Sequence, residues 1–320
     1  MKRLYFASFL PGLEAPMERL LRKTGGLSPE RMLTGGVLFR SNRTPELQFV
    51  RQCFLVLFQM KPSSSPDEAL RRLLTAGEWL NAIPYEEIAG KRFRITVSDG
   101  DKKIPANMRY VALLEKAIEE HTGMRVHREH PDTELWLLLR REASYFLMRI
   151  PSKETGGKGR MRPDVAGAIA LLMGYNPGKV ALLGTADAAL IRMLREQGAR
   201  QIAAVPAESG DESLYKQAKI RLISGTPEHT DLEDESCNGI CLCLSVRKDA
   251  SPAFDLRGAL HESARILARK GALVLVAPQQ HALEIVERNR SFETVERLFC
   301  NWGGNRMLIF SMRLIAPEEA

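Results

Sequence analysis

One short segment has the residue types to hold a small molecule through its backbone: Gly184-Thr185-Ala186-Asp187-Ala188, directly after the apolar run 180–183. A glycine after a buried strand lets the backbone approach a ligand, and the first N–H groups of a following helix attract electronegative atoms. Asp187 has a second interpretation, because an aspartate before a helix commonly caps its first N–H groups. The segment therefore predicts a strand, a turn and a helix, and capping is the favoured role of Asp187.

Two other groups of residues favour plainer interpretations. Cys237, Cys241 and Cys243 have the spacing C-x3-C-x-C, but the last two alternate with leucines in an apolar run. That pattern is typical of core cysteines rather than of metal ligands. The segment 156–160 (GGKGR) lacks the spacing and the Ser or Thr of a P-loop, so we interpret it as a linker. We therefore predict no metal site.

Two further segments, 261–262 and 302–304, also favour interpretations without chemistry. His261 and Glu262 lie in an amphipathic helical pattern, and we expect both on the surface. Trp302 precedes Gly303-Gly304 near the C-terminus, where packing within a turn is favoured over stacking on a base.

The C-terminal half must position this segment, and its pattern alternates between helices and strands. Strands and helices at this spacing predict a mostly parallel, doubly wound sheet. The last two strands lie close together in sequence and predict a terminal antiparallel hairpin, which is characteristic of class I methyltransferase sheets. The expected helices are 163–173, 187–197, 212–222, 255–269 and 281–288, and the expected strands are 179–183, 201–205, 239–245, 272–277, 293–299 and 306–314.

The N-terminal half predicts two small α+β units. Strands are expected at 4–10, 35–40 and 52–60, with Asp67 capping a helix that runs to Leu80. A second unit follows from about residue 91, with a strand at 92–98, a helix at 107–121 that ends near Gly123, and paired strands at 135–140 and 145–150. The predicted domains are therefore 1–88, 89–151 and 163–320, with a linker at 152–162.

Charge and composition narrow the class of partner. Residues 1–162 hold 28 Lys and Arg against 19 Asp and Glu, whereas residues 163–320 hold 18 against 20. A basic half favours a polyanion such as nucleic acid, because phosphate neutralisation releases counterions. No apolar run reaches the roughly 18 residues of a membrane span, and the N-terminus lacks a signal-peptide pattern. Five cysteines without framework spacing favour the reducing cytoplasm.

Four pieces of the chain, in order, resemble a known family. They are the opening 5–14 (YFASFLPGLE), the segment 35–39 (GGVLF), residues 91–150 with His130-Pro131-Asp132 before an apolar strand, and the helix start 162–166 (RPDVA). Together they resemble the THUMP-domain RNA methyltransferases of bacteria and archaea that methylate N2 of a guanosine in tRNA.

This resemblance implies a ferredoxin-like domain over 1–88, a THUMP RNA-binding domain over 89–151, and a Rossmann-like methyltransferase domain over 163–320 that uses S-adenosylmethionine (SAM). The first two would hold the acceptor region of a tRNA, and DNA and membranes are not expected partners. The candidate phosphate contacts are Lys91, Arg92, Arg94, Lys102, Lys103, Arg109, Arg128, Arg140, Arg141, Lys158 and Arg160.

The resemblance also implies three signals for chemistry, and this chain departs from each. The family's acidic, glycine-rich loop is represented by Gly184 alone, with Leu182 and Leu183 at the acidic position and its proline. The acidic residue that would bind the ribose is absent from the end of strand 201–205, and Glu208 comes two residues late. The catalytic Asn/Asp-Pro-Pro-aromatic tetrad is replaced within 240–247 (ICLCLSVR). We therefore predict no catalytic residue.

Two functions are favoured by the sequence, and a structural or protein-partner role without RNA stays open beside them. The first is an RNA-binding protein, for tRNA by resemblance, whose methyltransferase-like domain is catalytically degenerate and recruits a protein partner, widens the RNA footprint or stabilises the rest. The second is an active SAM-dependent tRNA (guanine-N2) methyltransferase with a divergent cofactor loop. In the second case the cofactor residues are Gly184, Thr185, Asp187 and Glu208.

Overall fold

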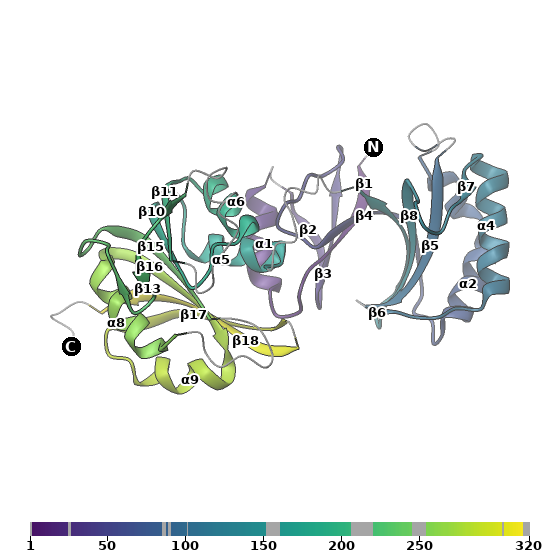
Figure 1. Ribbon diagram of the computed structural model, residues 1–320. Coiled ribbons are helices and arrows are strands. Elements are labelled where there is room, and N and C mark those ends of the chain that lie inside the picture. The colour runs from purple at the N-terminus through teal and green to yellow at the C-terminus, as the bar shows by residue number, and fades with distance from the viewer. Residues whose placement is uncertain are drawn as a thin grey trace. The chain divides into compact units, whose positions relative to one another are not determined.

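The computed structural model describes residues 2–24, 27–84, 88, 91–100, 102–151, 161–205, 220–244, 254–302 and 304–315. The chain divides into two compact units (Figure 1). The first unit contains residues 1–7, 37–46 and 52–153, and the second contains 8–36, 47–51 and 154–320. The division into domains 1–88, 89–151 and 163–320 stays a prediction.

The first unit is built on one curved, mixed sheet in the order β3-β1-β4-β9-β8-β5-β6, with β7 paired to β5. Antiparallel pairing of β4 with β9 joins the two segments that the sequence assigns to separate domains. Helices α2 and α4 pack together on one face of this sheet (Figure 1). The elements are β1 (Arg3–Ser8), β3 (Gly36–Ser41), β4 (Gln52–Met60), α2 (Pro66–Ala76), a 3-10 helix (Glu78–Ala82), β5 (Arg92–Asp99), β6 (Lys102–Lys103), α4 (Met108–Thr122), β7 (Arg125–Val126), β8 (Thr133–Leu139) and β9 (Ser144–Ile150).

Local sequence explains where the helices of this unit begin and end. Ser65, not Asp67, caps α2, because the Ser65 hydroxyl accepts a hydrogen bond from the N–H of Glu68. The expected helix to Leu80 ends at Ala76 and continues as the short 3-10 helix. Asn107 caps α4, and Gly123 ends it in a left-handed conformation as the sequence predicts.

The second unit contains a seven-stranded sheet in the order β12-β11-β10-β15-β16-β18-β17. β12, β11, β10, β15 and β16 are parallel, and β18 runs antiparallel to both β16 and β17. This is the doubly wound sheet with a terminal hairpin that the sequence predicts, and the hairpin is yellow in Figure 1. The strands are β10 (Gly178–Leu183), β11 (Ala199–Val205), β12 (Arg221–Leu222), β15 (Cys237–Cys243), β16 (Leu267–Pro278), β17 (Phe292–Trp302) and β18 (Asn305–Leu314).

Helices cover both faces of this sheet because its strands are apolar on both sides. The α5–α6 pair lies on one face, and the α8–α9 pair lies on the other (Figure 1). The expected helix 212–222 falls largely outside the described residues. The helices are α5 (Pro163–Leu172), α6 (Ala188–Glu196), α8 (Leu256–Ile266) and α9 (Gln279–Arg288). The same unit contains α1 (Glu14–Lys23), β2 (Pro29–Leu33), which the sequence did not predict, and the short antiparallel pair β13 (Gly225–Thr226) and β14 (His229–Thr230).

A buried carboxylate ties the N-terminal segment of this unit to α5. Asp164 is fully buried, and its Oδ2 accepts a hydrogen bond from the N–H of Leu10 at 2.8 Å. Arg162 donates to both carboxylate oxygens, from Nε at 3.0 Å and from Nη2 at 2.7 Å. The RPD sequence at the start of α5 therefore holds the chain that leads into α1.

The segment after Leu10 is fixed by two further contacts. Gly12 has a φ of +97°, and a Cβ there would lie 1.7 Å from the carbonyl oxygen of Phe299 in β17. The carboxylate of Glu14 accepts from the N–H of Gly12 at 2.8 Å and from the N–H of Gly35 at 2.9 Å. The segment Pro11-Gly12-Leu13-Glu14 is thus held in a fixed conformation against β17 of the terminal hairpin.

Replacing Asp164 tests the contact between the start of α5 and the segment at Leu10. Asp164→Ala leaves the Arg162 guanidinium without its carboxylate and the Leu10 N–H without its acceptor, so we expect the free energy of unfolding to fall by about 3 kcal/mol. Urea denaturation of the full chain measures the change. The exposed Asp231 offers the control, since Asp231→Ala should change the free energy by less than about 0.5 kcal/mol. Equal stability of the two variants would contradict the role of the carboxylate.

Candidate functional site

The candidate binding loop, 184–188, follows β10 at the carboxyl edge of the parallel sheet, where ligands of doubly wound folds bind. Gly184 has a φ of +78°, and its N–H donates to the carbonyl of Val205, at the end of β11, at 2.8 Å. α6 begins at Ala188, four residues later. The strand, turn and helix that the sequence predicts are therefore present.

The space beside Gly184 is filled by the protein itself. A Cβ at Gly184 would lie 2.4 Å from the carbonyl oxygen of Cys243 and 2.6 Å from Cε1 of Phe254. Phe254 is 7% exposed and belongs to the core under α8, with Leu183 and Leu260. The glycine therefore makes room for an aromatic ring and a neighbouring strand.

The other two described cofactor candidates are Asp187, which makes hydrogen bonds within the protein, and Thr185, which is half-buried. Asp187 caps α6 through Oδ1, which accepts from the N–H of Ala189 at 2.8 Å, and its Oδ2 accepts from the N–H of Met161 at 2.9 Å. Thr185 is half-buried in the turn. Glu208 lies outside the described residues. The structure thus brings Gly184, Thr185 and Asp187 into one loop and gives the aspartate a structural role.

The described residues of this loop make their contacts within the protein. Both carboxylate oxygens of Asp187 are already bonded, Leu182 and Leu183 are fully buried, and the Phe254 ring lies against Gly184. Within β15, Ile240, Cys241 and Leu242 are fully buried as well. Residues 245–247 of the expected catalytic segment lie outside the described part of the chain.

The cysteines of β15 lie in the core as the sequence predicts. Burial raises the pKa of the Cys243 thiol to about 12 and that of Cys241 well above its ordinary value, so neither forms a thiolate at neutral pH. Cys237 is fully buried with a raised pKa for the same reason. Among the described residues, no group of three His, Cys, Asp or Glu side chains is arranged to hold a metal ion.

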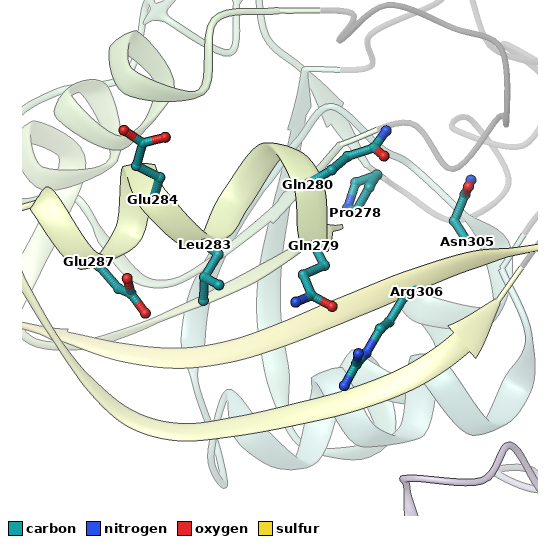
Figure 2. A pocket seen from close by; sticks show the side chains of 8 residues that line it. All are labelled: Pro278, Gln279, Gln280, Leu283, Glu284, Glu287, Asn305 and Arg306. Carbon is teal, nitrogen blue, oxygen red and sulfur yellow. The ribbon is translucent and has the colours of Figure 1, made fainter.

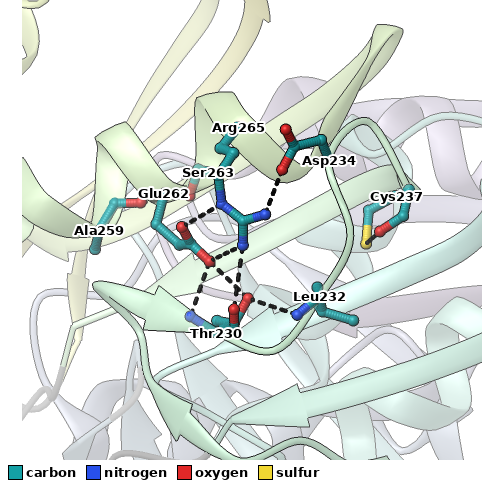
Figure 3. A network of polar contacts seen from close by, with 9 residues as sticks. Thr230, Leu232, Asp234, Cys237, Ala259, Glu262, Ser263 and Arg265 are labelled. Atoms are coloured by element: carbon teal, nitrogen blue, oxygen red, sulfur yellow. Dashed lines mark hydrogen bonds and ion pairs between the residues drawn. The ribbon is translucent and has the colours of Figure 1, made fainter.

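Glu262 corrects the expectation of a surface residue, because it is 3% exposed and central to a polar network (Figure 3). Its Oε1 accepts from the N–H and the hydroxyl of Thr230 at 2.8 and 2.6 Å. Arg265 donates to both of its oxygens and also bonds Asp234 and the carbonyl of Thr230. This network ties α8 to β14, and the neighbouring His261 is exposed as expected.

The predicted phosphate contacts of the first unit fall into two groups at opposite ends of β5. Lys91 and Arg92 lie at its start, beside Arg128 after β7, whereas the other group lies where β5 ends. Parallel pairing of β5 with β8 over Phe93–Asp99 separates the two ends by roughly 20 Å. The group at the end of β5, which we call the β6 group, comprises Lys102, Lys103, Arg109, Arg140 and Arg141.

Several of these cations already have partners. At the start of β5, Arg92 donates to both oxygens of Asp132, and these hydrogen bonds lower the pKa of that carboxyl to about 2. Arg94, within the strand, pairs with the nearly buried Glu134. In the β6 group, the half-buried Arg140 lies 5.6 Å from the centre of the Phe6 ring.

Both groups contain exposed cations, and Lys91, Arg92 and Arg128 at the start of β5 are all exposed. Lys102, Lys103, Arg109 and Arg141 are exposed. Lys103 lies 5.8 Å from the centre of the Trp136 ring. Lys158 and Arg160 lie outside the described residues.

The sequence did not predict a cavity of about 480 Å³ at the carboxyl end of β16. It lies between α9 and the start of β18 (Figure 2). No motif marks it, because its residues come from a strand end, one helix face and a hairpin turn. The lining residues are Pro278, Gln279, Gln280, Leu283, Glu284, Glu287, Asn305 and Arg306, and we call this cavity the α9 groove.

Comparison with solved structures shows the fold class of the protein. The chain has the fold of a Rossmann-like methyltransferase with an N-terminal α+β region. TrmN from Thermus thermophilus matches with a TM-score of 0.75 and 16% identity over 98% of this chain and 99% of that one. A predicted N6-adenine-specific DNA methylase from Listeria monocytogenes matches with a TM-score of 0.67 and 11% identity over 97% and 96%. SMU.472, solved with SAH, has a TM-score of 0.65 and 12% identity over 98% and 99%.

Comparisons at the level of sequence add nothing to this assignment. No family model matches the chain, and no curated protein matches it. The fold class that the sequence predicts, a mostly parallel sheet with a terminal hairpin, is thus confirmed. Within the described residues, no helix is both long enough and apolar enough to cross a membrane.

The Glu262 network predicts a pH dependence of stability. Hydrogen bonds from Arg265 and Thr230 outweigh burial and lower the pKa of Glu262 from 4.5 to about 2. A lowered folded-state pKa stabilises the protein above pH 4.5, and this contribution is lost as the pH falls toward 2. We expect Glu262→Gln to cost about 2 kcal/mol at pH 7 and progressively less below pH 4.5.

Urea denaturation of both proteins between pH 7 and pH 3 measures this difference. The exposed Glu233 provides a matched control, since Glu233→Gln should have a small effect that does not change with pH. A cost for Glu262→Gln that is constant down to pH 3 would show that its charge does not stabilise the fold.

Proposed function

We propose that this protein binds RNA, with tRNA as the expected class, and that its methyltransferase-like domain binds the RNA or a partner without using SAM. The RNA part is supported by the exposed Lys102 and Lys103 of the β6 group, in a half of the chain with 28 basic and 19 acidic residues. The full-length likeness to TrmN supports the same class of partner. In this proposal residues 89–151 form a THUMP-type RNA-binding domain and residues 1–88 assist it.

The observation that carries the second part is the packing at Gly184. The ring of Phe254 and the carbonyl of Cys243 pack against Gly184 on the side where a Cβ would lie, and this packing supports a structural reason for the glycine. Asp187 uses both oxygens to cap α6 and to hold Met161. A domain of this kind keeps the methyltransferase fold as a scaffold, so we assign no catalytic residue to it.

Calorimetric titration of SAM and of SAH into the full chain, with and without bulk tRNA, tests the cofactor claim. We expect no saturable binding at ligand concentrations up to about 1 mM, which corresponds to a binding free energy weaker than about −4 kcal/mol. SMU.472, whose structure contains SAH, is the positive control under the same conditions. Saturable micromolar binding would instead favour an active methyltransferase that uses Gly184 and Thr185.

Charge reversal tests the RNA claim. Lys102→Glu with Lys103→Glu removes two phosphate contacts and adds repulsion, so we expect tRNA affinity at 0.1 M salt to fall at least about tenfold. The dependence of log affinity on log salt should become shallower by about 2. Filter binding over a salt series measures both quantities.

The control reverses two exposed charges at the other end of the sheet, Lys91→Glu with Arg128→Glu. If the β6 group holds the RNA, this variant loses less affinity than the first. A larger loss in the control moves the site to the start of β5. Unchanged affinity in both variants contradicts RNA binding by these residues.

A further inference from the structure

The α9 groove has a chemical character that the proposed RNA contacts do not use. It lies in the second unit, at the carboxyl end of β16, and its volume of about 480 Å³ is in the range of small-molecule sites. Gln279, Leu283 and Glu287 point from one face of α9 toward the terminal hairpin (Figure 2). The groove therefore offers an amide, an aliphatic surface and a carboxylate along one wall.

The opposite wall presents a flat cation on an aromatic ring. The guanidinium carbon of Arg306 in β18 lies 5.2 Å from the centre of the Phe299 ring in β17. Arg297 lies at the same distance from that ring, and its Nη1 is 3.9 Å from the Glu287 carboxylate. Phe299 is half-buried and packs on the core below α9, so it is a firm support for Arg306. A guanidinium held on a ring is ordered before any ligand arrives.

These groups select for a planar, hydrogen-bonding ring. Nucleobases stack on arginine planes and are recognised by hydrogen bonds along their edges. The Glu287 carboxylate only accepts hydrogen bonds when ionised, so it favours a base with an exocyclic amino group, as in cytosine N4, over uracil, which presents an oxygen there. The Gln279 amide can donate as well as accept.

We propose that the α9 groove binds one unpaired nucleobase that carries an exocyclic amino group, stacked on Arg306 and hydrogen-bonded by Glu287 and Gln279. The base can belong to a free nucleoside or to a single-stranded segment of RNA, because both present the same ring and edge. The inference does not rest on the β6 group, which lies in the other unit, nor on any cofactor.

Cytidine and uridine form a matched pair of probes, since they have the same size and differ at position 4. Calorimetric or NMR titration of the full chain should give saturable binding of cytidine at least about fivefold tighter than that of uridine. The trinucleotides CpCpC and UpUpU form a second arm. Tighter binding of CpCpC than of cytidine identifies an RNA strand as the source of the base, and equal binding identifies the free nucleoside.

Two variants assign the binding to the groove. Arg306→Gln removes the stacking plane, so we expect the affinity for cytidine to fall about tenfold. Glu287→Gln should reduce the preference for cytidine over uridine to less than about twofold. Glu293→Gln and Arg313→Gln are matched controls, because these exposed residues pair at the far end of the same hairpin. They should leave both values unchanged.

The proposal fails if neither cytidine nor CpCpC binds saturably at millimolar concentration. It also fails if binding is as strong in Arg306→Gln as in the control variants, or if uridine binds as tightly as cytidine. These outcomes are separate from failure of the proposed function, because loss of tRNA affinity on reversal of Lys102 and Lys103 is measured on the other unit and needs no nucleoside.

Discussion

The buried carboxylate of Asp164 holds the N-terminal segment of the second unit against α5. A buried charge is tolerated only when it is paired and hydrogen-bonded, and here Arg162 and the Leu10 N–H meet that demand. Residues separated by 154 positions are thereby held together. The close approach of Gly12 to Phe299 then places the same N-terminal segment against the terminal hairpin. The segment 8–36 therefore folds with the C-terminal sheet.

Two places along the carboxyl edge of the second unit's sheet differ in how they are packed. At the carboxyl ends of β10 and β11, the loop is packed against Phe254 at Gly184, and Asp187 makes hydrogen bonds within the protein. At the end of β16, polar side chains surround open space. The open space along the carboxyl edge of this sheet therefore lies two strands away from β10.

The sequence predicts elements well where the signal is local. β4 has the bounds of its apolar run, α4 has its glycine end, and Asp187 caps α6. Prediction fails where the cause is distant. Glu262 has the position of a surface residue in its helix, and only Thr230, 32 residues away, shows why it is buried. The α9 groove has no signal, because it combines side chains from three elements.

The positions of the basic residues also depend on contacts that are distant in the sequence. Their number could be read from the chain, but their division between two ends of β5 follows from its parallel pairing with β8, which no local pattern reveals. Similarly, β2 was missed because its two exposed residues, Glu30 and Arg31, are adjacent, so the strand lacks the alternation of a half-buried strand.

Gly184 has a consequence for how such chains change over time. Any larger residue there would strike the Cys243 carbonyl or the Phe254 ring, and the positive φ adds strain. Selection for folding alone is then enough to retain the glycine. A glycine in such a loop can consequently be retained whether or not a cofactor binds there. Its presence in a sequence is therefore evidence for the fold and not for cofactor binding.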